Sequence, residues 1–309
     1  MTKDVSVVMP SYNRAHLLPL TIPTYLQEDV LELIIVDDCS TDNTKSIVMK
    51  LQAQYPQIRY ARNERNSKQP FSKNVGIGMA KGKYIYFGDD DSILLPNSIK
   101  HLKQTLNKVN SGGVMARPLC AGPDFKWEKR EKYIRWRLKR EKANSVSEIY
   151  DVANLRFDWG RWLTCPIEVP TCHACALVKT ELATQCLFDT NYKGCAYREE
   201  TDFFFRLNLD YGAKLYYDAR ACQLNLPNYM VRLSGARSGG YSVWREAAIE
   251  CNRYFLEKNW NKISKKYSIR KSAAEMQREF EMSLPLKEKQ ESKIKRLLKQ
   301  IYFALLVYT

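Results

Sequence analysis

Residues 5–14 read VSVVMPSYNR, and residues 32–44 read ELIIVDDCSTDNT. Each stretch begins with a short continuous apolar run, which is typical of a strand buried on both faces of a parallel sheet. Residues 58–61 and 83–88 add two similar runs, and segments with helical patterns separate them, at about 15–27, 40–54 and 70–80. Strands that alternate with helices predict an α/β, Rossmann-like fold with a mostly parallel sheet flanked by helices.

The rest of the chain divides into two further parts. A helix at 96–110 and a strand at 113–117 continue the pattern, which a basic insertion at 126–142 interrupts. A strand at 174–179, a helix at 199–211 and a strand at 214–217 follow, and the chain from 242 onward is helical and basic. We therefore expect a first half at 1–117, a second half at 118–228 and a basic helical C-terminal region at 229–309.

The charge of the 309-residue chain is concentrated in two segments. The chain has 49 basic and 34 acidic residues, a net charge of +15, with 45% apolar and 27% charged residues, which is ordinary globular composition. Residues 126–142 hold nine basic and three acidic residues, residues 229–309 hold seventeen and eight, and the remainder holds 23 of each sign. The sequence thus describes a neutral body with two basic attachments.

Targeting signals and cysteine usage indicate the cytoplasm. The N-terminus lacks the layout of a signal peptide, and the longest apolar run, at 301–308, is far shorter than a membrane-spanning helix. The nine cysteines are scattered, as expected for free thiols in a reducing compartment. The CxxC at 172–175 has no second ligand pair at a suitable spacing, which disfavours zinc.

Carboxylates gather after two of the predicted strands. Asp37 and Asp38 follow the second strand, and Asp89, Asp90 and Asp91 follow the fourth. Because ligands of open α/β sheets bind outside the carboxyl ends of the strands, these side chains are expected at one site. Adjacent carboxylates repel one another, and a hard divalent cation such as Mg²⁺ or Mn²⁺ relieves that repulsion. The alternative is a solvated acidic turn.

Three stretches, at 5–14, 32–44 and 63–91, resemble in order and spacing the GT-A-fold glycosyltransferases of family 2. The resemblance covers residues 4–117 and returns at 195–212. Members of this family are inverting enzymes that use nucleotide-diphosphate sugars, commonly with a divalent metal. The resemblance therefore implies a GT-A fold, a nucleotide-sugar donor, most simply a UDP-sugar, and Mn²⁺ or Mg²⁺ as the cofactor.

The resemblance also implies the donor site. Asp38 matches the carboxylate that binds the nucleotide base, and Asp89–Asp91 match the DxD motif, with Asp91 as the direct metal ligand and Asp89 near the metal and the donor's ribose or sugar. Arg65 and Lys68 stand where the family often has glycine. The other donor-site residues implied are Pro10, Tyr12, Arg14, Lys73, Asn74 and Asp90.

The segment YREETDFFFR at 197–206 resembles the start of the family's ED helix. The resemblance makes Glu200 the catalytic base, which deprotonates the acceptor hydroxyl as it attacks the anomeric carbon. Glu199 and Asp202 are the alternatives. Acidic residues also favour a helix N-terminus for purely structural reasons.

A Gly/Ser-rich loop at 233–240 carries Arg237. Such a loop could close over a diphosphate with backbone N–H groups and the guanidinium, or it could be a simple connector. The family commonly has a histidine in this region, whereas this chain has none after His173.

The two basic attachments favour a lipid surface. Trp127, Ile134 and Leu138 share one helical face among cations, and the Lys-rich segment 287–299 precedes the apolar run 301–308. These features predict peripheral attachment to an anionic membrane, on its cytoplasmic face. The alternatives are a solvated helical face, or packing on the protein or on a second subunit of a homo-oligomer.

Together these observations predict an inverting glycosyltransferase that acts on a hydroxyl of a glycan or lipid-linked acceptor. Two alternatives from other classes are a nucleic-acid-binding protein that uses the basic patches and an inactive GT-A partner subunit. We expect no nucleic-acid partner, because the acidic site would repel a polyanion.

Overall fold

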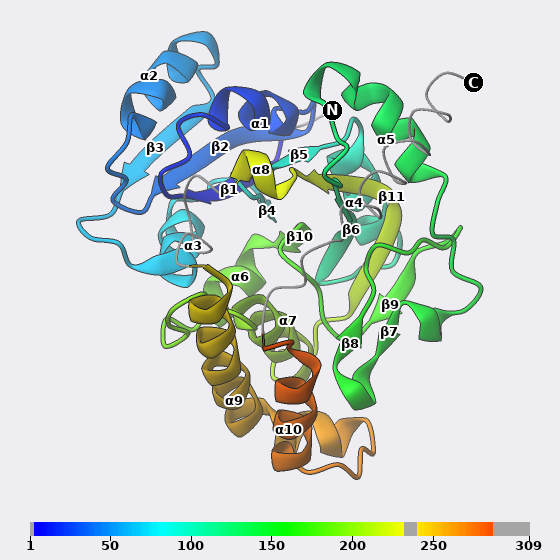
Figure 1. The fold of residues 1–309 in the computed structure, drawn as a ribbon. Coiled ribbons are helices and arrows are strands. Elements are labelled where there is room, and N and C mark those ends of the chain that lie inside the picture. The colour runs from blue at the N-terminus through cyan, green and yellow to red at the C-terminus, as the bar shows by residue number, and fades with distance from the viewer. Residues whose placement is uncertain (1–2, 232–239, 287–309) are drawn as a thin grey trace.

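The computed structural model describes residues 3–231 and 240–286. Its centre is a nine-stranded sheet in the order β3-β2-β1-β4-β10-β6-β11-β5, with β9 paired to β11 (Figure 1). Arg237, most of the loop at 233–240, the Lys-rich segment 287–299 and the apolar run 301–308 lie outside the described residues.

The first half of the sheet is the parallel βα array expected from the sequence. Its four strands are β1 (Val5–Ser11), β2 (Val30–Asp37), β3 (Ile58–Arg62) and β4 (Tyr84–Phe87), and the pairs β1–β2, β1–β4 and β2–β3 are parallel. The helices between them are α1 (Leu18–Tyr25), α2 (Thr44–Gln54) and α3 (Lys68–Met79). Figure 1 shows α1 and α2 on one side of this part of the sheet and α3 on the other.

The second half mixes strand directions. Strand β10 (Ala176–Lys179) runs antiparallel between β4 and β6 (Gly113–Cys120), and β11 (Leu215–Asn225) runs parallel to β6. The short strands β5 (Ser92–Leu94) and β9 (Ile167–Val169) pair antiparallel with β11. Strands β3, β2, β1, β4, β6 and β11 therefore share one direction, and the expectation of a mostly parallel sheet is confirmed.

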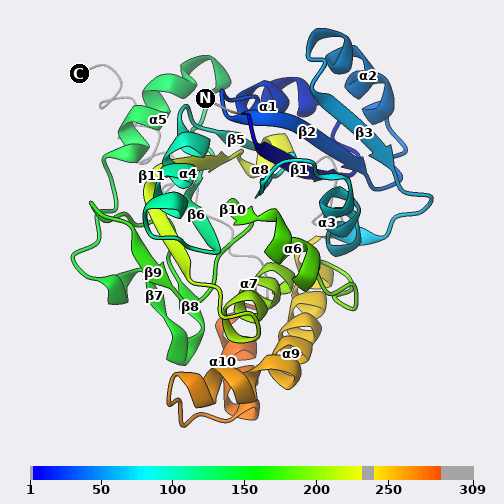
Figure 2. The same ribbon diagram turned by 180° about the vertical axis from the view of Figure 1, so that it is seen from behind.

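Helices and short elements complete the second half. They are α4 (Ser98–Lys108), η1 (Trp127–Lys129), α5 (Arg130–Leu138), η2 (Val146–Glu148), β7 (Tyr150–Asp151), η3 (Val152–Asn154), β8 (Arg156–Phe157), α6 (Thr180–Cys186), α7 (Glu199–Leu209) and α8 (Asn228–Val231). Figure 2 shows α6 and α7 below β10.

The basic insertion is packed onto the body rather than projecting from it. Tyr133 of α5 is buried, and Trp127 and Ile134 pack against the same apolar cluster. The buried guanidinium of Arg117 donates to the backbone carbonyls of Leu138, Arg140 and Gly160. Of the three apolar residues predicted to share a lipid-facing side, two therefore contact protein, and Leu138 is exposed.

The described part of the C-terminal region is also joined to the body. Helices α9 (Gly240–Lys266) and α10 (Ala273–Ser283) lie beside α7 at the lower end of the molecule (Figure 1). Phe255, Trp260 and Ile263 of α9 share an apolar cluster with Phe205 of α7, because this face of α9 is buried. No helix within residues 3–231 and 240–286 is both long and apolar enough to span a membrane.

Candidate active site

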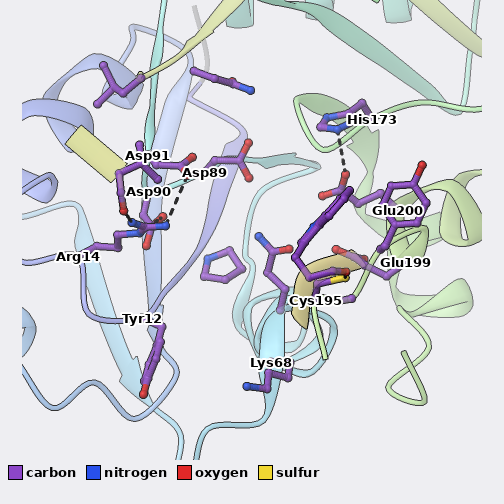
Figure 3. Close-up of a pocket in the computed structure, with 18 of the residues that line it drawn as sticks. Tyr12, Arg14, Lys68, Asp89, Asp90, Asp91, His173, Cys195, Glu199 and Glu200 are labelled. Carbon is purple, nitrogen blue, oxygen red and sulfur yellow. Dashed lines mark hydrogen bonds and ion pairs between the residues drawn. The ribbon is translucent and has the colours of Figure 1, made fainter. Parts of the chain in front are cut away.

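A cavity of about 1620 Å³ opens at the carboxyl ends of β1, β2 and β4. Figure 3 shows its two opposing walls: Arg14 and Asp89–Asp91 lie on one side, and His173, Glu199 and Glu200 lie on the other. The first wall comes from the first half of the sheet, and the second from the segment before β10 and the start of α7. The arrangement brings together groups that are more than 80 residues apart in the sequence.

The acidic wall is crowded. The guanidinium Nε of Arg14 lies 3.5 Å from Asp90 Oδ1, and its NH2 group lies 3.6 Å from Asp91 Oδ2. Burial and the neighbouring carboxylates raise the pKa of Asp89 to about 6 and that of Asp90 to about 7, although Arg14 lowers the latter. Burial, together with repulsion among the carboxylates, thus outweighs the stabilisation that Arg14 gives to the charged form.

A buried polar network fixes Asp89. Gln223 Nε2 of β11 donates to Asp89 Oδ2 at 2.9 Å. The hydroxyls of Tyr25 and Tyr86 both donate to Gln223 Oε1, at 3.2 and 2.9 Å, and all three side chains are almost fully buried. The amide of Gln223 therefore has one orientation, which presents its N–H to the carboxylate. Sequence reasoning missed Gln223, because a glutamine inside a strand carries no motif.

The donor set fits a divalent cation that shares its coordination with a substrate. Asp91 keeps about a third of its side chain exposed, and Asp89 has one oxygen outside the Gln223 hydrogen bond. Within the described ranges, no group of three or more His, Cys, Asp or Glu side chains is arranged to hold a metal. Mg²⁺ and Mn²⁺ are commonly bound by one or two carboxylates together with phosphate oxygens, and Asp89 and Asp91 match that requirement.

Asp38 lines the cavity and also shapes the loop beside it. Its Oδ1 accepts from Asn63 Nδ2 and the Ser67 backbone N–H, and its Oδ2 accepts from the Lys68 backbone N–H, all at 2.8 Å. Lys68 adopts φ +72°, in the left-handed region that favours glycine. The loop therefore keeps a glycine-like backbone with lysine in place, and the side chain of Lys68 lines the cavity (Figure 3).

On the opposite wall, Lys73 lies between two glutamates. Its ammonium contacts Glu199 Oε1 at 2.7 Å and Glu200 Oε1 at 2.6 Å, and the lysine is fully buried. Burial alone would lower the pKa of Lys73, but the two carboxylates raise it above its usual value. Lys73 was predicted near the nucleotide and diphosphate; the structure places it beneath the predicted base, and it is absent from the cavity lining.

The two glutamates differ in protonation. Burial raises the pKa of Glu199 to about 8, and its Oε2 is buried without a hydrogen-bond partner. Burial also penalises charged Glu200, but Lys73, then His173 and the Ala174 backbone N–H, bring its pKa below the usual value. Glu200 is therefore ionised at neutral pH, as a general base must be, whereas Glu199 holds a proton.

His173 lies at the cavity side of Glu200. Its Nε2 is 3.7 Å from Glu200 Oε2, and about half of its side chain is exposed. Sequence reasoning considered this histidine only as part of the CxxC. Cys172 and Cys175 are buried free thiols, and burial is the first cause that raises the pKa of each.

Two predicted site residues face away from the cavity. Asp202 is fully buried and accepts from Arg206, Lys258 and Asn259, so its carboxylate serves the packing of α7 on α9. Both amide atoms of Asn74 bond to the backbone of Phe188. The predicted residues that do line the cavity are Pro10, Tyr12, Arg14, Asp38, Asp89, Asp90, Asp91, Glu199 and Glu200.

Comparison with known proteins identifies the first half. The glycosyl transferase family 2 model matches residues 6–158. A Campylobacter jejuni GalNAc(5)-diNAcBac-PP-undecaprenol beta-1,3-glucosyltransferase is 37% identical over 107 residues, which are 34% of this chain and 35% of that protein. The chain thus matches only about a third of the length of this curated relative.

Solved structures extend the likeness to the whole fold. The structure of S. aureus TarS 1–349 in complex with UDP-GlcNAc superimposes with a TM-score of 0.57 at 17% identity, over 91% of this chain and 71% of that chain. The mannosyltransferase PcManGT from Pyrobaculum calidifontis, in complex with GDP-Man and Mn²⁺, gives a TM-score of 0.59 at 16% identity, over 100% and 82% of the two chains. The family match shows that the chain belongs to glycosyl transferase family 2, and the likeness to these solved structures shows that it has a GT-A fold.

Proposed function

We propose that this protein is an inverting glycosyltransferase that moves a sugar from a UDP-sugar to a hydroxyl group of a glycan or lipid-linked acceptor. The observation that carries the proposal is the pairing of two walls across one cavity, with the carboxylates Asp89–Asp91 on one and ionised Glu200 on the other. Each wall meets one requirement of the reaction: stabilising the departing diphosphate and deprotonating the acceptor.

The donor occupies the first wall. The uracil and ribose lie along Tyr12 and Asp38, the residues that the family resemblance assigns to the nucleotide. The diphosphate approaches Asp91 and Arg14. A divalent cation held by Asp91 and Asp89 would neutralise charge on the departing diphosphate. The donors named in two structural neighbours, UDP-GlcNAc and GDP-Man, and the Mn²⁺ named in one of them support a nucleotide sugar and a metal.

The acceptor approaches from the second wall. Its hydroxyl oxygen attacks the anomeric carbon from the side opposite the diphosphate, its proton passes to Glu200 Oε2, and the carbon–oxygen bond to the diphosphate breaks with the electron pair leaving on oxygen. Attack from the opposite face inverts the configuration. Lys73 holds Glu200 Oε1 at 2.6 Å, so Oε2 is the oxygen that accepts the proton.

A lipid-linked acceptor places the enzyme at a cytoplasmic membrane surface, and the exposed cations of α5 suit anionic lipid. Lys132, Arg135 and Lys139 are exposed, and each cation near such a surface contributes about 1 kcal/mol. Co-flotation with vesicles that contain phosphatidylglycerol tests this part. Replacement of all three by glutamate should abolish flotation, and unchanged flotation of that variant would remove α5 as the contact.

The decisive test of the activity is hydrolysis and transfer across a panel of nucleotide sugars, with Mn²⁺ and then with EDTA. We expect one UDP-sugar to be cleaved in a metal-dependent manner, with UDP as the product. Absence of binding and cleavage for every donor in the panel would refute the proposal. Inversion is checked by the anomeric coupling constant of the transferred sugar.

A further inference from the structure

The cavity extends beyond the two catalytic walls, onto the N-terminal turns of α9. Val243, Trp244 and Ala247 of α9 line it together with Tyr197, which lies three residues before Glu200. Its volume of about 1620 Å³ exceeds the roughly 300–1,000 Å³ of a typical ligand pocket. The cavity therefore has room for a second ligand beside the donor.

Helix α9 is built tightly against the segment that leads into α7. Gly194, at φ +60°, lies under α9 so closely that a Cβ there would be 2.8 Å from the Ala247 Cβ. Cys251 Sγ donates to the Lys193 carbonyl at 3.2 Å. Lys258 contacts Asp189 at 2.6 Å and also reaches Asp202 of α7. The start of α9 is consequently held in a defined position relative to Glu200.

The aromatic side chains at this end pack against one another. The Tyr197 ring stacks on the Phe280 ring with centroids 5.3 Å apart. The Arg198 guanidinium lies 5.0 Å from the centroid of the Tyr197 ring. Trp244 meets Tyr197 edge to face at 6.2 Å and is tilted against Tyr241 at 5.8 Å. Beside them Val243 is 59% exposed. Val243 thus presents apolar surface beside an aromatic cluster that lines the same cavity.

We infer that Trp244, Tyr197 and Val243 form an acceptor subsite that binds a saccharide ring by stacking. This inference rests on the proposed function and specifies its acceptor side. The face of a pyranose ring presents C–H groups of partial positive charge, which pack on the negative face of an aromatic ring, while its hydroxyls remain at the edge. Stacking on Trp244, which packs against Tyr197, brings a ring hydroxyl into the same cavity that Glu200 lines.

The position of the subsite selects a saccharide acceptor. The donor wall is crowded with carboxylates and Arg14, whereas the residues of α9 that line the cavity, Val243, Trp244 and Ala247, are uncharged. The neighbouring Arg198 already packs on the Tyr197 ring and donates to Asn252 Oδ1. Neutral sugar rings suit such a surface better than a phosphate group does. The C-terminal helical region, predicted from sequence as a membrane attachment, thus contributes through α9 to substrate binding.

Ligand-observed saturation-transfer NMR tests the subsite. The probes are p-nitrophenyl glycosides of glucose, galactose and N-acetylglucosamine, with UDP and Mn²⁺ present and dodecyl phosphate as a competing apolar probe. Trp244→Ala should weaken glycoside binding about tenfold, the upper range for one aromatic contact, and leave UDP binding unchanged. Trp244→Phe should recover most of the affinity, and Trp162→Ala, outside the cavity lining, is the matched control.

Val243→Asp is a second variant, and it should leave the packing of the protein intact because the Val243 side chain is exposed. It should also weaken glycoside binding without lowering the melting temperature. Wild-type binding of dodecyl phosphate but of no glycoside, or glycoside binding unaffected by Trp244→Ala and Val243→Asp, would overturn the subsite. Failure of the wild type to bind UDP would instead refute the proposed function.

Discussion

Lys73 Nζ of α3 lies 2.6 Å from Glu200 Oε1 of α7, and the same ammonium lies 2.7 Å from Glu199 Oε1. The contact joins the first half of the chain to the helix that carries the proposed base, across 127 residues of sequence. Because Lys73 is fully buried, its charge acts on the glutamates rather than on a solvent-exposed ligand. The lysine is therefore a positioning residue that keeps Glu200 ionised.

Replacement of Lys73 by methionine should move the acidic limb of the kcat–pH profile toward neutral pH. Without the ammonium, the pKa of Glu200 rises, so the base is protonated over a wider range and kcat at pH 6 falls by about 10- to 100-fold. Steady-state kinetics from pH 5 to 9 measures the effect, and the KM for the donor should change by less than about threefold.

Lys108→Met, at an exposed position in α4, is the matched control for Lys73→Met. A raised donor KM with an unshifted pH profile would show instead that Lys73 acts on the donor.

Glu200→Gln should lower kcat for transfer by at least about 100-fold, since the amide cannot accept the acceptor's proton. Affinity for UDP, measured by isothermal titration calorimetry, should remain within about twofold, as Glu200 lies on the wall opposite the proposed donor site. Asp202→Asn should mainly reduce stability, because this carboxylate binds three side chains of α7 and α9. A folded Asp202→Asn protein without activity, alongside an active Glu200→Gln protein, would reverse the assignment.

Stability should fall as pH rises from about 5 to 8. The pKa of Glu199 is about 8 in the folded chain, against 4.5 for an ordinary glutamate. Between these two pH values the folded chain holds a proton that the unfolded chain has released, and the stability that this proton contributes is lost as pH rises through 8. Asp89 and Asp90, with raised pKa values of about 6 and 7, act in the same direction at lower pH. Glu199→Gln should flatten the melting-temperature profile between pH 7 and 8, and a profile as steep as that of the wild type would contradict a protonated Glu199.

Asp91→Ala should weaken Mn²⁺-dependent UDP binding by about tenfold or more, because it removes the most exposed carboxylate of the proposed metal site. EDTA should weaken UDP binding by the wild type to the same extent, and it should weaken UDP binding by Asp91→Ala little further. Asp210→Ala, which removes a surface ion pair with Lys262, is the control. UDP affinity that responds to neither EDTA nor the substitution would exclude this metal site.

Lys68→Gly should raise the free energy of unfolding by about 1 kcal/mol, because φ +72° carries strain for any residue with a Cβ. Lys68→Ala keeps the Cβ and removes only the charge, so it separates backbone strain from electrostatics. Urea denaturation measures both variants. A Gly variant no more stable than the Ala variant would show that the loop bears no strain at this position.

Much of the first half was predictable because its signals are local. Continuous apolar runs at 5–9 and 32–36 determine buried strands, and polar residues directly after them must lie at the carboxyl edge of the sheet. Asp38 and Asp89–Asp91 were placed on the cavity for that reason. The second half carries fewer local signals: β11 extends eight residues beyond the predicted 217, because its continuation is stabilised by pairing with β5 and β6 rather than by its own pattern.

The sequence by itself determined the GT-A-type βα array, the acidic triplet and the cluster of carboxylates at the start of α7, since each depends on residues that are close in the chain. Only the tertiary structure decided which carboxylates are buried against other helices and which line the cavity. Asp202 and Glu200 are two residues apart, yet one is buried against α9 and the other faces the cavity beside His173. Lys73, Gln223 and Trp244 acquire their roles from partners far away in sequence, because protonation and orientation depend on the charges and burial that packing creates.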